Sequence, residues 1–187
     1  MDVTRRATLI AMAAGAAPAA PAVPATQGED GPRLAELVAI EEIKQLKARY
    51  FRAVDAQDWA AFRAVFTDDA IYYRTDPSRV EASAVEEIAG GDRIIALVRE
   101  RFQGAQSLHL GFMPIIEILS ARTARGSWSM EDRVDWPDRA LHGLGYYQET
   151  YAKGADGSWR IASFRLDRVR VEVRPVTTPV APAGDGR

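Results

Sequence analysis

The sequence predicts an α+β domain in which helices cover one face of a curved, mainly antiparallel sheet. Two observations carry this prediction. Apolar residues recur at helical spacing in segments that end before residue 103, and from residue 107 onward they follow the alternation typical of strands. No internal repeat is visible, and the length suits one domain of about 140–150 residues with a tail at each end.

Three helices are expected in the first half of the domain. The first spans residues 34–54, and the second covers residues 58–66, where Asp58 is placed to act as the N-cap. Residues 71–73 are expected to form a strand, and residues 93–102 the third helix. The apolar stripe of the first helix consists of Ile40, Ile43, Leu46, Tyr50 and Val54.

Long strands are expected in the second half. Their predicted ranges are 107–119, 123–136, 141–153 and 158–173, with a hairpin turn between the last two. In the second strand, one face carries Ala124, Gly126, Trp128 and Met130.

The last predicted strand carries a row of arginines. Arg168, Arg170 and Arg174 alternate with valines, so we expect the three arginines to lie on the solvated side of this strand.

Composition excludes several classes of function. The net charge of −2 leaves no electrostatic footprint for nucleic acid. The chain has no cysteine, which excludes disulfides and thiolate nucleophiles, and its two histidines do not have the spacing of a zinc site. We therefore expect neither a metal nor another cofactor.

The N-terminus is typical of an export signal. Residues 1–25 begin with a charged stretch containing Arg5-Arg6, continue with a short apolar run and end on small residues, as in a twin-arginine signal peptide. The apolar run is too short to cross a bilayer, so no membrane insertion of the mature protein is expected. Residues 26–32 then form a linker, residues 33–174 the domain and residues 175–187 a disordered tail. The expected location is periplasmic or secreted; the alternative is a disordered leader on a cytoplasmic protein.

Asp55 is unusual for its position. It closes the first helix, where a carboxylate meets the negative end of the helix dipole. It could face solvent, or accept backbone N–H bonds from the following turn. A functional role is the third possibility.

Several segments resemble a known family. They are AVDAQDW with FTDDA, then SLHLG, then DGSWRI, in an order that covers residues 33–173. This pattern resembles a SnoaL-like domain of the nuclear transport factor 2-like superfamily. The resemblance implies a cone-like α+β barrel, with a bent sheet wrapped around the long helix and a deep apolar pocket. It also implies a homo-oligomer, a dimer or a trimer formed through the open sheet.

The dehydratase and dehydrochlorinase branch of this superfamily is the most similar. The resemblance implies that Asp55 pairs with His109, and bile acid dehydratase-like members also carry a tyrosine five residues before the aspartate, which Tyr50 matches. A basic residue of the last strand completes such sites, and Arg165 is the nearest candidate. Tyr50 lies about 140° from Asp55 on an ideal helix, so both reach one pocket only if the sheet clasps the helix or the helix bends.

These residue types suit an elimination reaction. An imidazole titrates near neutral pH and can remove a carbon-bound proton, while a carboxylate on its other nitrogen fixes the tautomer. The sequence thus predicts a cofactor-independent lyase, a dehydratase acting on a hydrophobic small molecule, with His109 as base, Asp55 orienting it and Tyr50 as donor.

Two other functions stay open at this point. Asp55 itself could be the base of a ketosteroid-isomerase-like enzyme, or the domain could be a non-catalytic module that binds a small ligand or a protein. In the second case His109 and Tyr50 are ordinary core residues.

Overall fold

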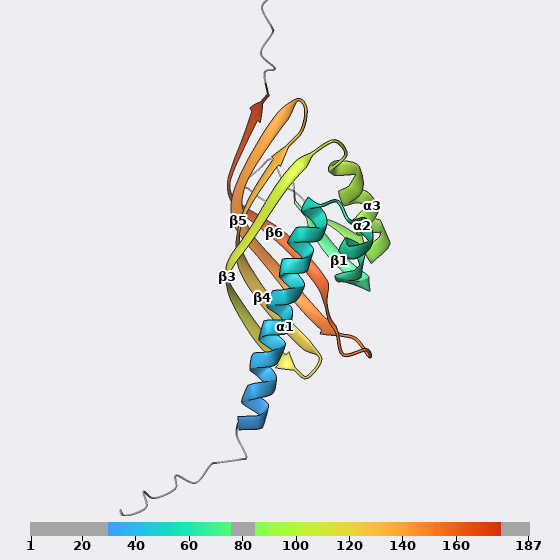
Figure 1. Cartoon of the computed structure of the whole chain (residues 1–187), viewed down its shortest axis with the longest axis vertical. Helices are drawn as coiled ribbons and strands as arrows, with labels where there is room; N and C mark the ends of the chain where they lie inside the picture. Colours follow the sequence, from blue (N-terminus) through green and yellow to red (C-terminus); the bar gives the residue numbers. More distant parts are fainter. Residues whose placement is uncertain (1–29, 76–84, 177–187) are drawn as a thin grey trace, which may run out of the picture.

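The computed structural model describes residues 30–75 and 85–176, and in it three helices pack against one six-stranded sheet (Figure 1). The predicted α+β class is therefore confirmed. The predicted export signal and residues 177–187 of the predicted tail lie outside the described residues and stay predictions. Residues 30–32 of the predicted linker belong to the first helix, and residue 175 of the predicted tail ends the last strand. The elements are α1 Asp30–Asp55, α2 Trp59–Ala64, β1 Phe66–Arg74, β2 Glu86–Ala89, α3 Gly91–Arg101, β3 Gln106–Ser120, β4 Thr123–Asp135, β5 Arg139–Lys153 and β6 Trp159–Pro175.

The sheet is curved and open. Its strand order is β2-β1-β6-β5-β4-β3; only the β1–β6 pair is parallel, and the two end strands do not pair with each other. The helix α1 lies along the inner face of the four long strands, while α2 and α3 lie beside β1 (Figure 1). The domain thus has the shape of a cone that the sheet wraps only in part.

The sequence did not predict the short strand β2. The four residues of β2 pair only with β1, and a strand of this length is too short to show an alternation. The N-cap of α2 is confirmed, because the Asp58 carboxylate accepts the backbone N–H of Ala61 at 3.0 Å.

The predicted apolar stripe of α1 faces the sheet. Its buried positions follow the helical spacing closely, and one of them is a lysine, Lys47. The other buried residues of this face are Ala39, Ile43, Leu46, Tyr50, Phe51 and Val54.

The prediction that Arg168 faces solvent is wrong. Gly145 of β5 pairs with Arg168 of β6, whereas the residue before Gly145 pairs with Arg170, so Val169 forms a bulge. The extra residue reverses the alternation after Arg168: Phe164, Leu166 and Arg168 line the cavity together, whereas Val169 and Arg170 are exposed. The strands approach so closely here that a Cβ on Gly145 would lie 2.2 Å from the carbonyl oxygen of Asp167.

Candidate active site

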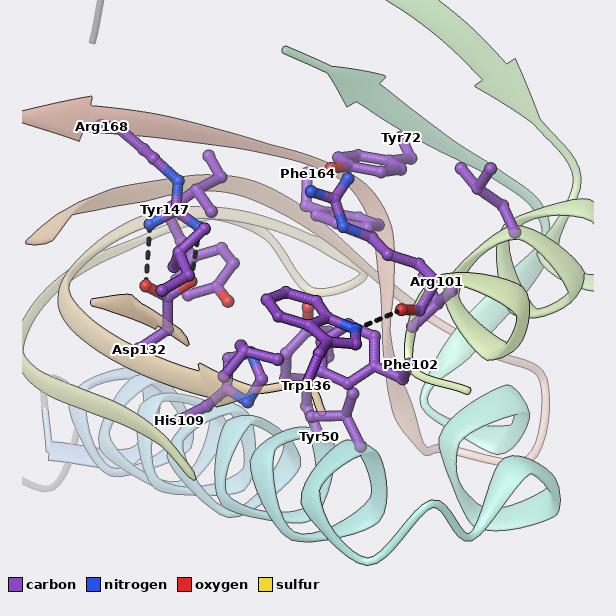
Figure 2. Close-up of a pocket in the computed structure, with 16 residues that line it drawn as sticks. Tyr50, Tyr72, Arg101, Phe102, His109, Asp132, Trp136, Tyr147, Phe164 and Arg168 are labelled. Carbon is purple, nitrogen blue, oxygen red and sulfur yellow. Dashed lines mark hydrogen bonds and ion pairs between the residues drawn. The ribbon is translucent and has the colours of Figure 1, made fainter. Parts of the chain in front are cut away.

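A cavity of about 80 Å³ lies between the inner face of the sheet and helices α1 and α3 (Figure 2). Its wall consists mainly of aromatic and aliphatic side chains, and its charged or titratable members include His109, Arg101 and the pair Asp132 and Arg168. The aromatic side chains of the wall are Tyr50, Tyr72, Phe102, Trp136, Tyr147 and Phe164.

Asp55 and His109 are in direct contact. The Oδ1 atom of Asp55 lies 2.6 Å from Nδ1 of His109, and Oδ2 accepts the backbone N–H of the same histidine at 2.9 Å. The hydroxyl of Ser107 donates to Oδ1 at 2.8 Å. The last residue of α1 is therefore the anchor of the first part of β3, which accounts for a carboxylate at an otherwise unfavourable helix position.

Asp55 binds His109 from outside the cavity lining. His109 lines the cavity, whereas Asp55 does not. Because Nδ1 is held by Asp55, Nε2 is the nitrogen left for chemistry in the cavity. Two aromatic rings fix the plane of the imidazole: Phe51 is stacked on it at 6.4 Å between centroids, and Phe102 is at 5.7 Å.

The contacts of Asp55 keep it ionised. Burial raises the pKa of its carboxyl, but the hydrogen bonds from the His109 ring, the His109 backbone and Ser107 outweigh burial, so the pKa is lowered overall. An ionised Asp55 accepts a proton-bearing Nδ1, and this fixes the tautomer in which Nε2 carries a free lone pair.

Tyr50 lines the cavity from α1, one and a half turns before Asp55. Tyr50 enters the cavity from α1 (Figure 2), whereas Asp55 binds the ring and the backbone of His109 from outside the cavity lining, so no bend in the helix is needed. Burial and the carboxylate of Glu149 both raise the pKa of Tyr50, so its hydroxyl stays protonated and available as a donor.

Arg168 and Asp132 form a buried ion pair on the cavity wall. Nη1 and Nη2 of Arg168 lie 2.7 and 2.5 Å from the two carboxylate oxygens of Asp132, and the residues are only 8% and 3% exposed. Asp132 is directly opposite His109 in the β3–β4 register. Among the described residues, Nε of Arg168 has no hydrogen-bond partner, which leaves one guanidinium donor unused beside the cavity.

A glycine makes room for this ion pair. Gly143 of β5 pairs with Asp132 in the sheet, and a Cβ at this position would lie 1.7 Å from Nη1 of Arg168 and 2.3 Å from Oδ1 of Asp132. Any side chain at residue 143 would therefore displace the ion pair.

Arg165 does not lie in the cavity, contrary to the prediction. Its side chain is exposed on the outer face of the sheet, where Nε and Nη2 bind the Asp167 carboxylate at 2.7 and 2.9 Å. The basic residue that β6 brings to the cavity is Arg168, three positions later, on the same face of the strand as Phe164 and Leu166.

Sequence reasoning also missed Asp132. The signal was present, since continuing the alternation of Trp128 and Met130 by two residues places Asp132 on the buried face of β4. A charged residue on a buried face indicates an ion pair or a functional group.

Within residues 30–75 and 85–176, no three carboxylate or imidazole side chains are grouped as a metal site would need. No helix in the described part of the chain has the length and hydropathy needed to cross a membrane.

Sequence comparison assigns this fold to a known family. The model of the SnoaL-like domain family matches residues 35–165, so the chain belongs to this family. The predicted SnoaL-like family is therefore confirmed.

Three solved structures illustrate the similarity. A type 2 hexachlorocyclohexane dehydrochlorinase, LinA, superposes with a TM-score of 0.64 at 16% identity, covering 81% of this chain and 99% of its own. A protein provisionally named a scytalone dehydratase, from Novosphingobium aromaticivorans, gives 0.63 at 17% identity, covering 80% and 97%. A variant of Rv3472, a protein of unknown function from Mycobacterium tuberculosis, gives 0.63 at 24% identity, covering 76% and 79%. These similarities establish the fold.

Proposed function

We propose that the chain is a cofactor-independent lyase that eliminates water from a hydrophobic β-hydroxy carbonyl compound. The observation that carries the proposal is the Asp55–His109 contact of 2.6 Å, which leaves the other imidazole nitrogen for a cavity with aromatic walls. Two of the structural neighbours, named a dehydrochlorinase and a dehydratase, support an elimination.

His109 is the proposed base. Its Nε2 takes the proton from the carbon next to the carbonyl, and the C–H electrons form the new C=C bond as the C–O bond to the β-hydroxyl breaks. The imidazolium then returns the proton to the departing hydroxide, which leaves as water, so the enzyme ends unchanged. Asp55 stabilises the imidazolium in between, because it is held ionised by three hydrogen bonds.

Tyr50 and Arg168 are the proposed donors to substrate oxygen. The Tyr50 hydroxyl stays protonated and can donate to the carbonyl, where negative charge develops as the proton leaves. Arg168 replaces Arg165 in the role that the sequence assigned to a basic residue of the last strand, because its Nε on the cavity wall has no partner among the described residues.

The geometry favours this function over the two alternatives. An isomerase with Asp55 as base needs this carboxylate in the cavity, but Asp55 is outside the lining and already accepts three hydrogen bonds. A binding module has no need for an imidazole whose tautomer is fixed beside the cavity.

A substrate screen tests the proposal. Purified protein is incubated with apolar β-hydroxy ketones and aldehydes of increasing size, and formation of the conjugated product is followed by absorbance. The series starts with single-ring compounds, because about 80 Å³ is small compared with most ligand pockets. His109→Ala should lower kcat by at least about a hundredfold.

The chain offers a matched control. His142 is its second histidine and binds Glu131 on the sheet surface at 2.9 Å, so His142→Ala should keep the wild-type rate. A His109→Ala protein that folds and turns over as fast as wild type would refute the proposed role of His109.

A further inference from the structure

A second buried ion pair, between Lys47 and Glu149, lies next to two aromatic side chains that line the cavity. Nζ of Lys47 is 2.5 Å from Oε1 of Glu149, and the two side chains are 1% and 0% exposed. The other oxygen of Glu149 accepts the hydroxyl of Tyr151 at 2.5 Å, and this hydroxyl accepts the indole N–H of Trp128 at 2.8 Å. Both oxygens of the buried carboxylate are therefore satisfied.

The ammonium group of Lys47 lies in a cage of aromatic rings. Its nitrogen is 3.4 Å from the ring centre of Tyr147, 4.1 Å from that of Tyr50 and 4.7 Å from that of Phe51. One of the three N–H bonds of an ammonium is used by Glu149, and the ring faces receive the remaining positive charge. Two of these rings, Tyr50 and Tyr147, line the cavity on their other side.

Stability alone does not account for this arrangement. Replacing a buried ion pair by apolar residues of similar volume is often neutral or even stabilising. Lys47 occupies a position on the buried stripe of α1 where Ile43 and Leu46 show that an apolar side chain would fit the pattern. We therefore expect a functional role of this ion pair. The groups that contact Lys47 and also line the cavity are the phenols of Tyr50 and Tyr147.

We propose that Lys47, held by Glu149, is a positioning residue for Tyr50 and Tyr147. It fixes the two rings through their faces and places a positive charge directly behind them. When Tyr50 donates a hydrogen bond to the substrate oxygen, partial negative charge grows on the phenol, and the Lys47 cation stabilises that charge against the repulsion of Glu149. This role of Tyr50 rests on the proposed function, whereas the fixing of the rings does not.

The proposal implies that kcat falls at alkaline pH. The groups that face the ammonium are Glu149 and Tyr147 from β5 and Tyr50 from α1. Burial lowers the pKa of Lys47 to about 8, and the attraction of Glu149 opposes this effect. Since the cation is lost as pH rises through this pKa, kcat should fall over the same range.

An NMR experiment tests the cage without any substrate. The chain has only three lysines, Lys44, Lys47 and Lys153, so their signals in ¹³C-lysine protein are readily assigned. The ε-methylene protons of Lys47 should be shifted upfield by the rings, and its pKa should be the lowest of the three. Signals of Lys47 that coincide with those of Lys44, which lies on the surface, would overturn the proposal.

A second NMR experiment follows the tyrosines. Lys47→Met alone leaves Glu149 charged and buried, so the variant used is Lys47→Met/Glu149→Gln, in which both charges are removed. Its ¹³Cζ signals of Tyr50 and Tyr147 should move, while that of the exposed Tyr146 should not. Unmoved signals of Tyr50 and Tyr147 in the folded variant would overturn the proposal.

Kinetics test the effect on catalysis. The double variant should melt at or above the wild-type temperature yet lose about tenfold in kcat, with a much smaller change in KM. In a Tyr50→Phe background the further loss should vanish, because the charge acts through that hydroxyl. Lys44→Met is the control and should match wild type.

The two proposals can fail separately. An unchanged kcat in the double variant, or a loss that simply adds to that of Tyr50→Phe, would overturn the role of Lys47 while leaving the lyase intact. If no compound is turned over, the proposed function fails, and the NMR results still decide whether Lys47 holds the two phenols.

Discussion

Asp55 and His109 are 54 residues apart in the chain, yet the carboxylate binds both the ring and the backbone of this histidine, at 2.6 and 2.9 Å. The backbone bond is as important as the ring bond, because it fixes Asp55 relative to β3 and leaves the imidazole little freedom to turn away. The contacts that orient the proposed base therefore also attach α1 to the sheet.

The substitution Asp55→Asn tests this orientation. The amide oxygen can keep the backbone bond to His109, but the NH₂ group then faces Nδ1 and donates to it, which forces the proton onto Nε2 and removes the basic lone pair. We expect kcat to fall by about a hundredfold or more with little change in fold. Steady-state kinetics and circular dichroism measure the two effects.

Asp58→Asn is the matched control for Asp55→Asn. Asp58 caps α2 three residues later, and asparagine is an equally good N-cap, so this variant should retain both rate and stability. Equal losses in the two variants would indicate a general effect of removing charge rather than a role for the Asp55–His109 contact.

Acid should weaken the fold through the same carboxyl. The pKa of Asp55 is lower in the folded protein than its ordinary value of 3.8, so its ionisation stabilises the fold above that value, and this contribution is lost as pH falls through the folded pKa. The free energy of unfolding from urea titrations should decline at acid pH in wild type and decline less steeply in Asp55→Asn. Parallel profiles would contradict this assignment.

Much of the fold could be predicted because its signals are local. The helical spacing of Ile43, Leu46 and Tyr50 and the alternation through Trp128 and Met130 predict the elements and their buried faces. The position of Arg168 is missed because the alternation with the valines assigns it to the same face as Arg170 and Arg174. A bulge at Val169 separates it from them, and such a bulge depends on how two strands pair.

The same distinction between local signals and long-range pairing applies to the candidate site. The Asp55–His109 pair was found through a resemblance, since nothing local indicates a contact across 54 residues. The charges of Lys47 and Asp132 were overlooked although both lie on stripes that are otherwise apolar. Their burial is explained only by partners on other strands, Glu149 and Arg168, and a single sequence does not show such pairs.

The Arg168–Asp132 pair should be necessary for function and dispensable for stability. Arg168→Met leaves the Asp132 carboxylate buried without its partner and should cost about 3–5 kcal/mol of unfolding free energy. Arg168→Met/Asp132→Leu should recover most of that loss but not the activity, because the guanidinium donor is still absent. Chemical denaturation and kcat measure the two quantities.

Arg165→Met provides the comparison on the same strand. Arg165 also binds an aspartate with two hydrogen bonds, but the pair is exposed, so its loss should change the unfolding free energy by only about 0–1 kcal/mol. A cost as large as that of Arg168→Met would contradict the distinction between the two pairs.

Gly143 should tolerate no side chain while the ion pair is present. Gly143→Ala places a Cβ 1.7 Å from Nη1 of Arg168, so we expect a loss of stability of about 2 kcal/mol or more together with a loss of activity. The stability cost should shrink in the Arg168→Met/Asp132→Leu background, where the obstructing groups are gone. Gly31→Ala, with no atom within 4 Å of the added Cβ, is the control.

The homo-oligomer predicted from the sequence stays a prediction, and the outer face of β3 is where we expect it to form. β3 is an edge strand, and a row of exposed apolar side chains on an edge is typical of an interface. On the outer face of the neighbouring strand β4, the charges of Arg133 and Glu131 are paired, and those of Arg165 and Asp167 are paired on β6, so two copies would not repel each other there. The exposed apolar residues of β3 are Leu108, Leu110, Phe112, Met113, Ile115 and Leu119.

Sedimentation velocity tests this interface. Wild type should sediment as a dimer or a trimer at micromolar concentration, and Leu110→Lys/Phe112→Lys should shift it to the monomer, because two lysines facing a second copy would be buried without partners. Leu37→Lys places one charge on a more exposed leucine of α1 and should leave the oligomer unchanged. A wild-type monomer at all concentrations would refute the oligomer, and an unchanged oligomer in the double variant would place its interface elsewhere. Since His109 and Leu108 or Leu110 point to opposite faces of β3, the monomeric variant should retain the cavity and its dyad.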